Sequence, residues 1–203
     1  MSARKLDSFD NICEYYRKWI IRIDSEEFER PVHLIWLSDS LDDFKDKILI
    51  LPNGNLIGSF TTKGLINYVS KTKNEIFDKR KTKAWTKRIK GFRTKVSTVN
   101  NFDLLTPSGK FIDKVKIEGI AHFINLFTDL VDSTKDSKLE RLRGKKEIKE
   151  IWEHFYTYIF WPRFNDAKKY KTFKAKRFAN NLKLQRTLKK MTDEFLKRIE
   201  IVQ

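Results

Sequence analysis

The sequence is poor in cysteine, glycine and proline, with one, seven and four of them in 203 residues. The single cysteine, Cys13, excludes an internal disulfide and is typical of a protein kept in a reducing compartment. No stretch approaches the roughly 20 apolar residues that a membrane-spanning helix needs, and the first residues lack the apolar core of a signal peptide. We therefore expect a cytoplasmic protein with no transmembrane segment.

The motifs of the common enzyme classes are also missing. The sequence contains no Gly-x-Ser-x-Gly, Walker loop, Gly-x-Gly-x-x-Gly, Cys-x-x-Cys or His-Glu-x-x-His. Cys13 lies on the apolar side of its predicted helix, where a thiol is a poor nucleophile. We accordingly predict no catalytic residue, no metal ligand and no cofactor, and we lean against an enzyme while leaving that class open.

Charge is abundant and unevenly distributed along the chain. Residues 1–70 hold nine basic and eleven acidic side chains, whereas residues 71–203 hold 34 basic and 16 acidic ones. The whole chain has a net charge of +16. The basic residues concentrate again in 71–95, with eleven basic and two acidic side chains. This asymmetry indicates an acidic partner, whether nucleic acid, an anionic membrane or an acidic protein.

The sixteen Phe, five Trp and six Tyr residues indicate a chain that folds around a core. Apolar residues at helical spacing predict a helix over 9–23, capped by Asp7 or Ser8. The run 32–37 is rich in β-branched and aromatic residues and short enough for a buried strand. The order of these elements favours an α+β fold with a small N-terminal antiparallel sheet and flanking helices.

Pro52-Asn53-Gly54-Asn55 is the clearest local signal. Asn53-Gly54 is typical of a type I′ turn, which requires positive φ at both residues. We therefore predict a hairpin of strands 48–51 and 56–60.

The second half of the chain is predicted to be mainly helical. The polar break 132–138 divides the chain into an α+β domain over 1–131 and a helical region over 139–203, expected to pack on it. One helix should stop at Trp161-Pro162 because proline interrupts helical hydrogen bonding. The other predicted elements are a helix over 62–69 capped by Thr61 or Thr62, helices over 85–92, 117–131, 148–159 and 184–202, and a strand within 96–105.

The basic run 71–95 is the first candidate binding site. Phosphate backbones and acidic proteins both require several cations on one surface, and single-stranded nucleic acid also uses aromatic platforms. In the alternative interpretation, the aromatic residues of this run face the core and the cations form a solvated helix surface. The candidate partner-binding residues are Arg80, Lys83, Trp85, Lys87, Arg88 and Lys90.

An acidic loop is the second candidate. Its carboxylates are Asp39, Asp42, Asp43 and Asp46. Clustered carboxylates can hold Mg²⁺ or Ca²⁺, and Asp43-Phe44-Lys45 is a fragment of a nuclease-like D-x-K signature. The order of the surrounding strands does not fit that signature, so a solvated loop is the favoured interpretation over a metal-dependent nuclease.

Three segments together resemble the opening of small immunity proteins, which neutralise toxins in bacterial contact-dependent and other polymorphic toxin systems. The segments are His33-Leu-Ile-Trp-Leu-Ser-Asp-Ser, Ile48-Leu-Ile-Leu-Pro-Asn-Gly-Asn-Leu-Ile-Gly-Ser-Phe and the helix over 62–69, about a fifth of the chain. The resemblance implies a non-catalytic protein that binds a cognate toxin. The basic charge implies that the toxin offers an acidic contact surface, unless the acidic loop meets a basic toxin. A basic nucleic-acid-binding protein is the alternative.

Overall fold

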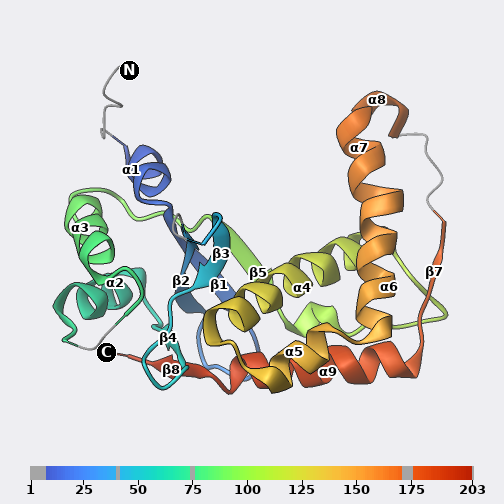
Figure 1. Cartoon of the computed structure of the whole chain (residues 1–203). Helices are drawn as coiled ribbons and strands as arrows, with labels where there is room; N and C mark the ends of the chain where they lie inside the picture. The colour runs from blue at the N-terminus through green and yellow to red at the C-terminus, as the bar shows by residue number, and fades with distance from the viewer. Residues whose placement is uncertain (1–7, 40–41, 74–75, 171–175, 203) are drawn as a thin grey trace. The chain divides into compact units, whose positions relative to one another are not determined.

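The computed structural model describes residues 8–39, 42–73, 76–170 and 176–202, apart from three side chains, those of Leu104, Ala167 and Lys169 (Figure 1). The chain divides into two compact units. The first combines Met1–Asn100, Asp132–Thr134 and Leu196–Gln203, and the second combines Asn101–Val131 and Lys135–Phe195. This division differs from the predicted domains 1–131 and 139–203 in two respects. Residues 101–131 belong to the second unit, and the last strand of the chain pairs within the first.

The first unit contains a four-stranded sheet in the order β3-β2-β1-β5. Its strands are β1 (Lys18–Asp24), β2 (Val32–Asp39), β3 (Lys45–Ile48) and β5 (Thr98–Asn101). β1 pairs antiparallel with β2, with Lys18 opposite Leu37, and β2 pairs antiparallel with β3, with Asp39 opposite Lys45. The predicted α+β class with an N-terminal antiparallel sheet is confirmed.

The predicted helix over 9–23 is wrong in its second half. Helix α1 (Phe9–Tyr16) is capped by the Ser8 hydroxyl, which accepts a hydrogen bond from the Asn11 amide, and it ends at Arg17 with φ of 52°. The chain then continues as β1. Ile20 and Ile23 satisfy helical spacing, but their branched side chains fit a pleated strand, and pairing with β2 decides the outcome.

The chain turns back at the predicted position, but strands 48–51 and 56–60 do not form the predicted regular hairpin. β3 ends at Ile48, the returning strand β4 spans Leu56–Gly58, and an isolated bridge joins Ile50 to Leu56. The Gly54 amide donates to the Leu51 carbonyl at 2.9 Å, and the Leu51 amide donates to the Asn55 carbonyl at 2.8 Å. Gly54 has φ of 83°, whereas Asn53 is not among the residues with positive φ, so the type I′ prediction is wrong. The loop has three residues, and the last of them, Gly54, has a left-handed conformation, which is typical of a type I turn followed by a bulge. Pro52 favours this turn because its ring fixes φ at the first turn position.

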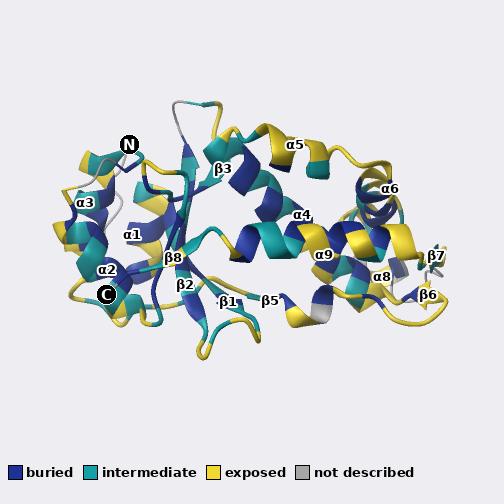
Figure 2. Cartoon of the chain, turned by 90° about the horizontal axis from the view of Figure 1, so that it is seen from below, coloured by how far each residue is buried: buried dark blue, intermediate teal, exposed yellow. Residues whose placement is uncertain are grey.

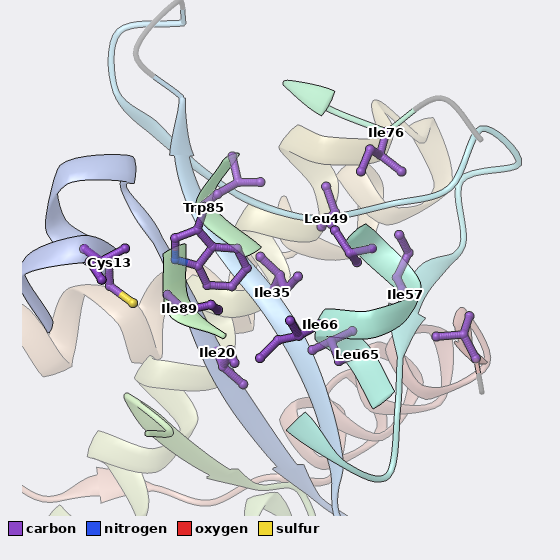
Figure 3. Close-up of a cluster of buried hydrophobic side chains, with 14 of the residues drawn as sticks. Cys13, Ile20, Ile35, Leu49, Ile57, Leu65, Ile66, Ile76, Trp85 and Ile89 are labelled. Carbon is purple, nitrogen blue, oxygen red and sulfur yellow. The ribbon is translucent and has the colours of Figure 1, made fainter. Parts of the chain in front are cut away.

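Two further helices, α2 and α3, belong to the first unit. Helix α2 (Thr62–Lys71) is capped by Thr61, whose hydroxyl accepts from the Gly64 amide at 2.9 Å. Helix α3 (Lys79–Ile89) carries Trp85, which is fully buried in a cluster that also contains Cys13 and residues of the sheet (Figure 3). Burial raises the pKa of the Cys13 thiol to about 11, so the thiol stays protonated at neutral pH.

The second unit is mainly helical, as predicted. The small strands β6 (Phe111–Ile112) and β7 (Phe178–Ala179) pair antiparallel. Its remaining elements are the 3-10 helix η1 (Asp103–Leu105), α4 (Lys114–Thr134), α5 (Ser137–Arg143), α6 (Lys146–Phe155), the π-helical segment η2 (Tyr156–Phe160), α7 (Trp161–Asn165), α8 (Ala167–Tyr170) and α9 (Leu182–Leu196). The burial colours of Figure 2 show both buried and exposed residues along α9.

Two predicted helix ends differ from the structure. Helical structure continues past Pro162, because this proline occupies the first turn of α7, where its missing amide hydrogen is not needed. The predicted helix over 184–202 instead ends at Leu196, and β8 (Ile199–Ile201) pairs parallel with β4 (Leu56–Gly58). Among the described helices, none is both long and apolar enough to cross a membrane.

Candidate binding surface on helix α3

Helix α3 has one buried side and one charged side, as its sequence periodicity predicted. Thr82, Trp85, Thr86 and Ile89 are buried, and the basic residues between them project outward at a spacing of 3.6 residues per turn. The buried side fixes the helix to the core, so the charged side is presented by a rigid element.

Four exposed cations on and directly after this helix have no ionic partner among the described residues. Arg80, Lys87, Arg88 and Lys90 are exposed and form no ion pair with any residue that the structure describes. We call these four residues the α3 basic face. Lys83, a predicted member, lies outside this set because its Nζ donates to the Thr72 carbonyl at 2.8 Å. The available cations are therefore fewer than the sequence suggested.

The predicted partner contact of Trp85 is wrong. Its side chain is 0% exposed, and Figure 3 shows its indole among the apolar side chains of the core. An aromatic platform for nucleotide bases must be open to solvent. Trp85 therefore anchors α3 and cannot stack on a ligand in this structure.

A pocket of about 280 Å³ lies in the first unit beside the start of α3. We call it the α3 pocket. It brings together the end of α1, the start of β1, the end of β2 and the first turn of α3. The lining residues are Tyr15, Tyr16, Arg17, Lys18, Ser38, Asp39, Phe77, Asp78 and Lys81.

An ion pair between a buried lysine and a half-buried aspartate forms one wall of this pocket. Lys18 Nζ lies 3.2 Å from Asp78 Oδ2, and the Lys18 side chain is only 2% exposed. Burial lowers the pKa of Lys18 below its ordinary value, although Asp78 acts in the opposite direction. Asp78 precedes α3 with φ of 46° and does not cap the helix with its side chain. Its carboxylate is directed to Lys18 instead.

Two carboxylates of the acidic loop pair with lysines. Asp39, predicted to be solvated, is 4% exposed and accepts from Lys47 Nζ at 2.7 Å. Asp42 lies 3.1 Å from the same ammonium, and the hydrogen bond from Lys45 lowers the pKa of Asp42. Residues 40–41 lie outside the described residues. Within the described part of the chain, no three acidic, histidine or cysteine side chains are grouped as metal ligands.

The other two loop carboxylates differ from this pair. Asp43 is exposed, with φ of 53°. Asp46 is half-buried, and burial raises the pKa of its carboxyl. Of the four predicted acidic residues, the structure therefore brings only Asp39 to the α3 pocket.

Sequence reasoning missed the main components of the pocket. Lys18 was assigned to the middle of a helix, and its partner Asp78 is 60 positions away. One usable signal was the run Trp19-Ile20-Ile21 after Lys18, because aromatic and β-branched residues indicate a strand. The pairing with Asp78 has no sequence signal, because it depends on the tertiary fold.

The second unit carries exposed aromatic side chains. Trp161 is 48% exposed and Phe164 is 72% exposed. Rings four residues apart follow one another along α6, η2 and α7, with centroid separations of 4.7 Å for Trp152–Tyr156, 5.1 Å for Tyr156–Phe160 and 5.9 Å for Phe160–Phe164. This surface is apolar, whereas the α3 basic face is charged.

Comparisons with known proteins show the fold alone. No protein-family model matches the sequence, and no curated protein matches it. A solved structure, the crystal structure of the SatS C-terminal domain in complex with bromine, is similar to this chain with a TM-score of 0.60 and 13% identity. The match covers 93% of this chain and 96% of that one. The chain therefore shares the arrangement of its elements with that domain.

Proposed function

We propose that this chain is a non-catalytic protein-binding factor of the immunity type, which binds and neutralises a cognate bacterial toxin through the α3 basic face. One observation carries the proposal. Four exposed cations lie on and directly after a helix fixed by a buried tryptophan, without an ionic partner in the described residues. A partner with an acidic contact surface would neutralise these cations by forming ion pairs with them.

The physical basis is electrostatic complementarity on a rigid support. Exposed cations of one sign raise the rate at which an oppositely charged partner arrives. Because none of these cations pairs with a described acidic residue, the partner's carboxylates would not have to displace an ion pair that the structure describes. The acidic loop is less suited to this role, since Lys45 and Lys47 already neutralise part of its charge.

Binding to nucleic acid is the second candidate. The guanidinium groups of Arg80 and Arg88 could contact phosphates of a duplex, because arginine donates in a geometry that matches phosphate oxygens. Trp85 is buried and therefore offers no open ring on which a base could stack. We therefore rank an acidic protein before nucleic acid.

The test is co-expression with the toxin candidates encoded beside the gene for this chain. We expect the wild-type chain to restore growth, and the variant with Arg80, Lys87, Arg88 and Lys90 replaced by Glu to lose this protection. A matched control replaces four exposed cations of the second unit by Glu, with the same change in net charge. These are Arg141, Lys145, Lys149 and Lys168. Protection that survives the first variant, or fails in both, would contradict the proposal.

A salt titration with duplex and single-stranded oligonucleotides separates the two candidates. We expect weak binding that is lost between about 50 and 200 mM salt, as for a basic surface without a built phosphate site. Submicromolar binding that persists at physiological salt and disappears in the α3 variant would favour the nucleic-acid candidate.

A further inference from the structure

The α3 pocket combines features that the α3 basic face lacks. Its volume of about 280 Å³ lies near the lower limit for small-molecule pockets, which begin at about 300 Å³. The size suits a single side chain or a small organic acid better than a nucleotide. Tyr15, 60% exposed, and the exposed Lys81 border the pocket, whereas Lys18 is buried in its wall.

The charges of the lining favour one negative group. Three cations, Arg17, Lys18 and Lys81, face two carboxylates, Asp39 and Asp78. The charge of Asp39 is further neutralised by Lys47 at 2.7 Å. The lining therefore carries a surplus of positive charge.

Lys18 is the group best placed to receive that negative charge. An ammonium has three donors, and within the described part of the chain the Lys18 side chain donates one hydrogen bond, to Asp78 at 3.2 Å. The lowered pKa of Lys18 indicates that Asp78 does not fully offset the cost of burying this ammonium. A second anion beside Lys18 would reduce that cost.

We propose that the α3 pocket is a carboxylate-binding socket that receives one acidic side chain of the protein partner, an inference that rests on the proposed protein-binding function. A carboxylate brings one negative charge, which matches the surplus of three cations over two carboxylates in the lining. Tyrosine at the rim of a pocket is typical of protein interfaces, where it covers an anchored side chain.

The socket is tested first without the partner. N-acetyl-glutamate N-methylamide is titrated into the full-length isotope-labelled chain, and the amide signals of Arg17, Lys18 and Lys81 are followed by NMR. The neutral glutamine analogue and inorganic phosphate serve as comparison ligands. We expect saturable binding of the glutamate analogue in the millimolar range, roughly tenfold or more tighter than the glutamine analogue. Equal binding of all three ligands, or no saturable binding, would overturn the proposal.

Matched double variants locate the binding. Lys18→Met with Asp78→Asn removes both charges of the buried pair, so that neither remains alone in the wall. The control, Lys189→Met with Asp193→Asn, removes an exposed ion pair on α9. We expect the first variant to bind the glutamate analogue at least about tenfold more weakly and the control to bind it as the wild type does. Unchanged binding in the first variant would overturn the assignment to this pocket.

Failure of the socket and failure of the proposed function give different results. Loss of a buried contact changes mainly the dissociation rate of a complex, whereas loss of exposed charges changes mainly the association rate. With the neutralised toxin as ligand, we expect the Lys18/Asp78 variant to dissociate roughly tenfold faster. If the glutamate analogue binds but no toxin is neutralised, the socket stands and the proposed function fails. If the toxin dissociates at the wild-type rate from a folded Lys18/Asp78 variant, the socket is not part of the interface.

Discussion

The α3 basic face and the acidic loop both begin as runs of like charge in the sequence, yet they become different surfaces. In the α3 basic face, no acidic residue lies three or four positions from any of the four cations, and these cations stay without ionic partners in the described structure. In the acidic loop, Lys45 and Lys47 lie within the same stretch and pair with Asp42 and Asp39.

The comparison shows what decides whether a charged segment can bind a partner. A charge run whose opposite charges lie close in sequence neutralises itself on folding. A run attached to the core by apolar residues keeps its charges toward solvent. In α3 this attachment is Trp85, which is why the residue that was expected to contact a partner is instead the one that holds the basic face in place.

Removing the aromatic anchor should have the largest effect on stability. We expect Trp85→Ala to lower the free energy of unfolding by about 3–5 kcal/mol, because it leaves a large cavity in the core. Phe44→Ala in the acidic loop should cost less than about 1 kcal/mol, since Phe44 is 53% exposed. Urea denaturation followed by circular dichroism measures both. Similar losses in the two variants would mean that α3 is not held by its tryptophan.

Neutralising one residue of the acidic loop and one of the α3 basic face should change the free energy of unfolding less, and by unequal amounts. Asp39→Asn is expected to destabilise the fold by about 2–3 kcal/mol, because Lys47 loses its buried partner. Arg88→Gln should change the free energy of unfolding by less than about 0.5 kcal/mol, as for other exposed residues. The same urea titration compares them. A cost for Arg88→Gln as large as that for Asp39→Asn would show that the basic face is structurally paired.

The smallest expected effect is a pH-dependent one at Asp46. Burial raises the folded-state pKa of this carboxyl above its unfolded value, so the folded state holds the proton more tightly. Its contribution to stability is present at low pH and is lost as the pH rises through the folded-state pKa. Asp46→Asn should therefore stabilise the protein at pH 7 and have no stabilising effect at pH 3. Thermal unfolding at both pH values tests this, and an equal gain at the two would refute the assignment.

Local patterns predicted the parts of the fold that local chemistry determines. The Thr61 cap, the return of the chain around Gly54 and the two-sided character of α3 each depend on residues within one or two turns. The class of fold followed from the order of these elements.

The remaining features depend on contacts between distant residues. The change from helix to strand at Arg17 requires β2 as a partner, and β8 requires β4, about 140 positions earlier. The α3 pocket could not be predicted for the same reason. Its buried pair joins Lys18 and Asp78, and both elements that carry these residues must be in place before the pocket exists.

The association rate with the neutralised toxin tests the central claim most directly. Stopped-flow measurements at about 50 and 150 mM salt would compare the wild-type chain, the α3 variant with four Glu replacements, and the second-unit control of equal net charge. The account predicts that the α3 variant associates at least about tenfold more slowly at the lower salt, with a weaker salt dependence, and that the control stays within about threefold of the wild type. Equal slowing in the two variants would contradict it, because net charge alone would then explain the association.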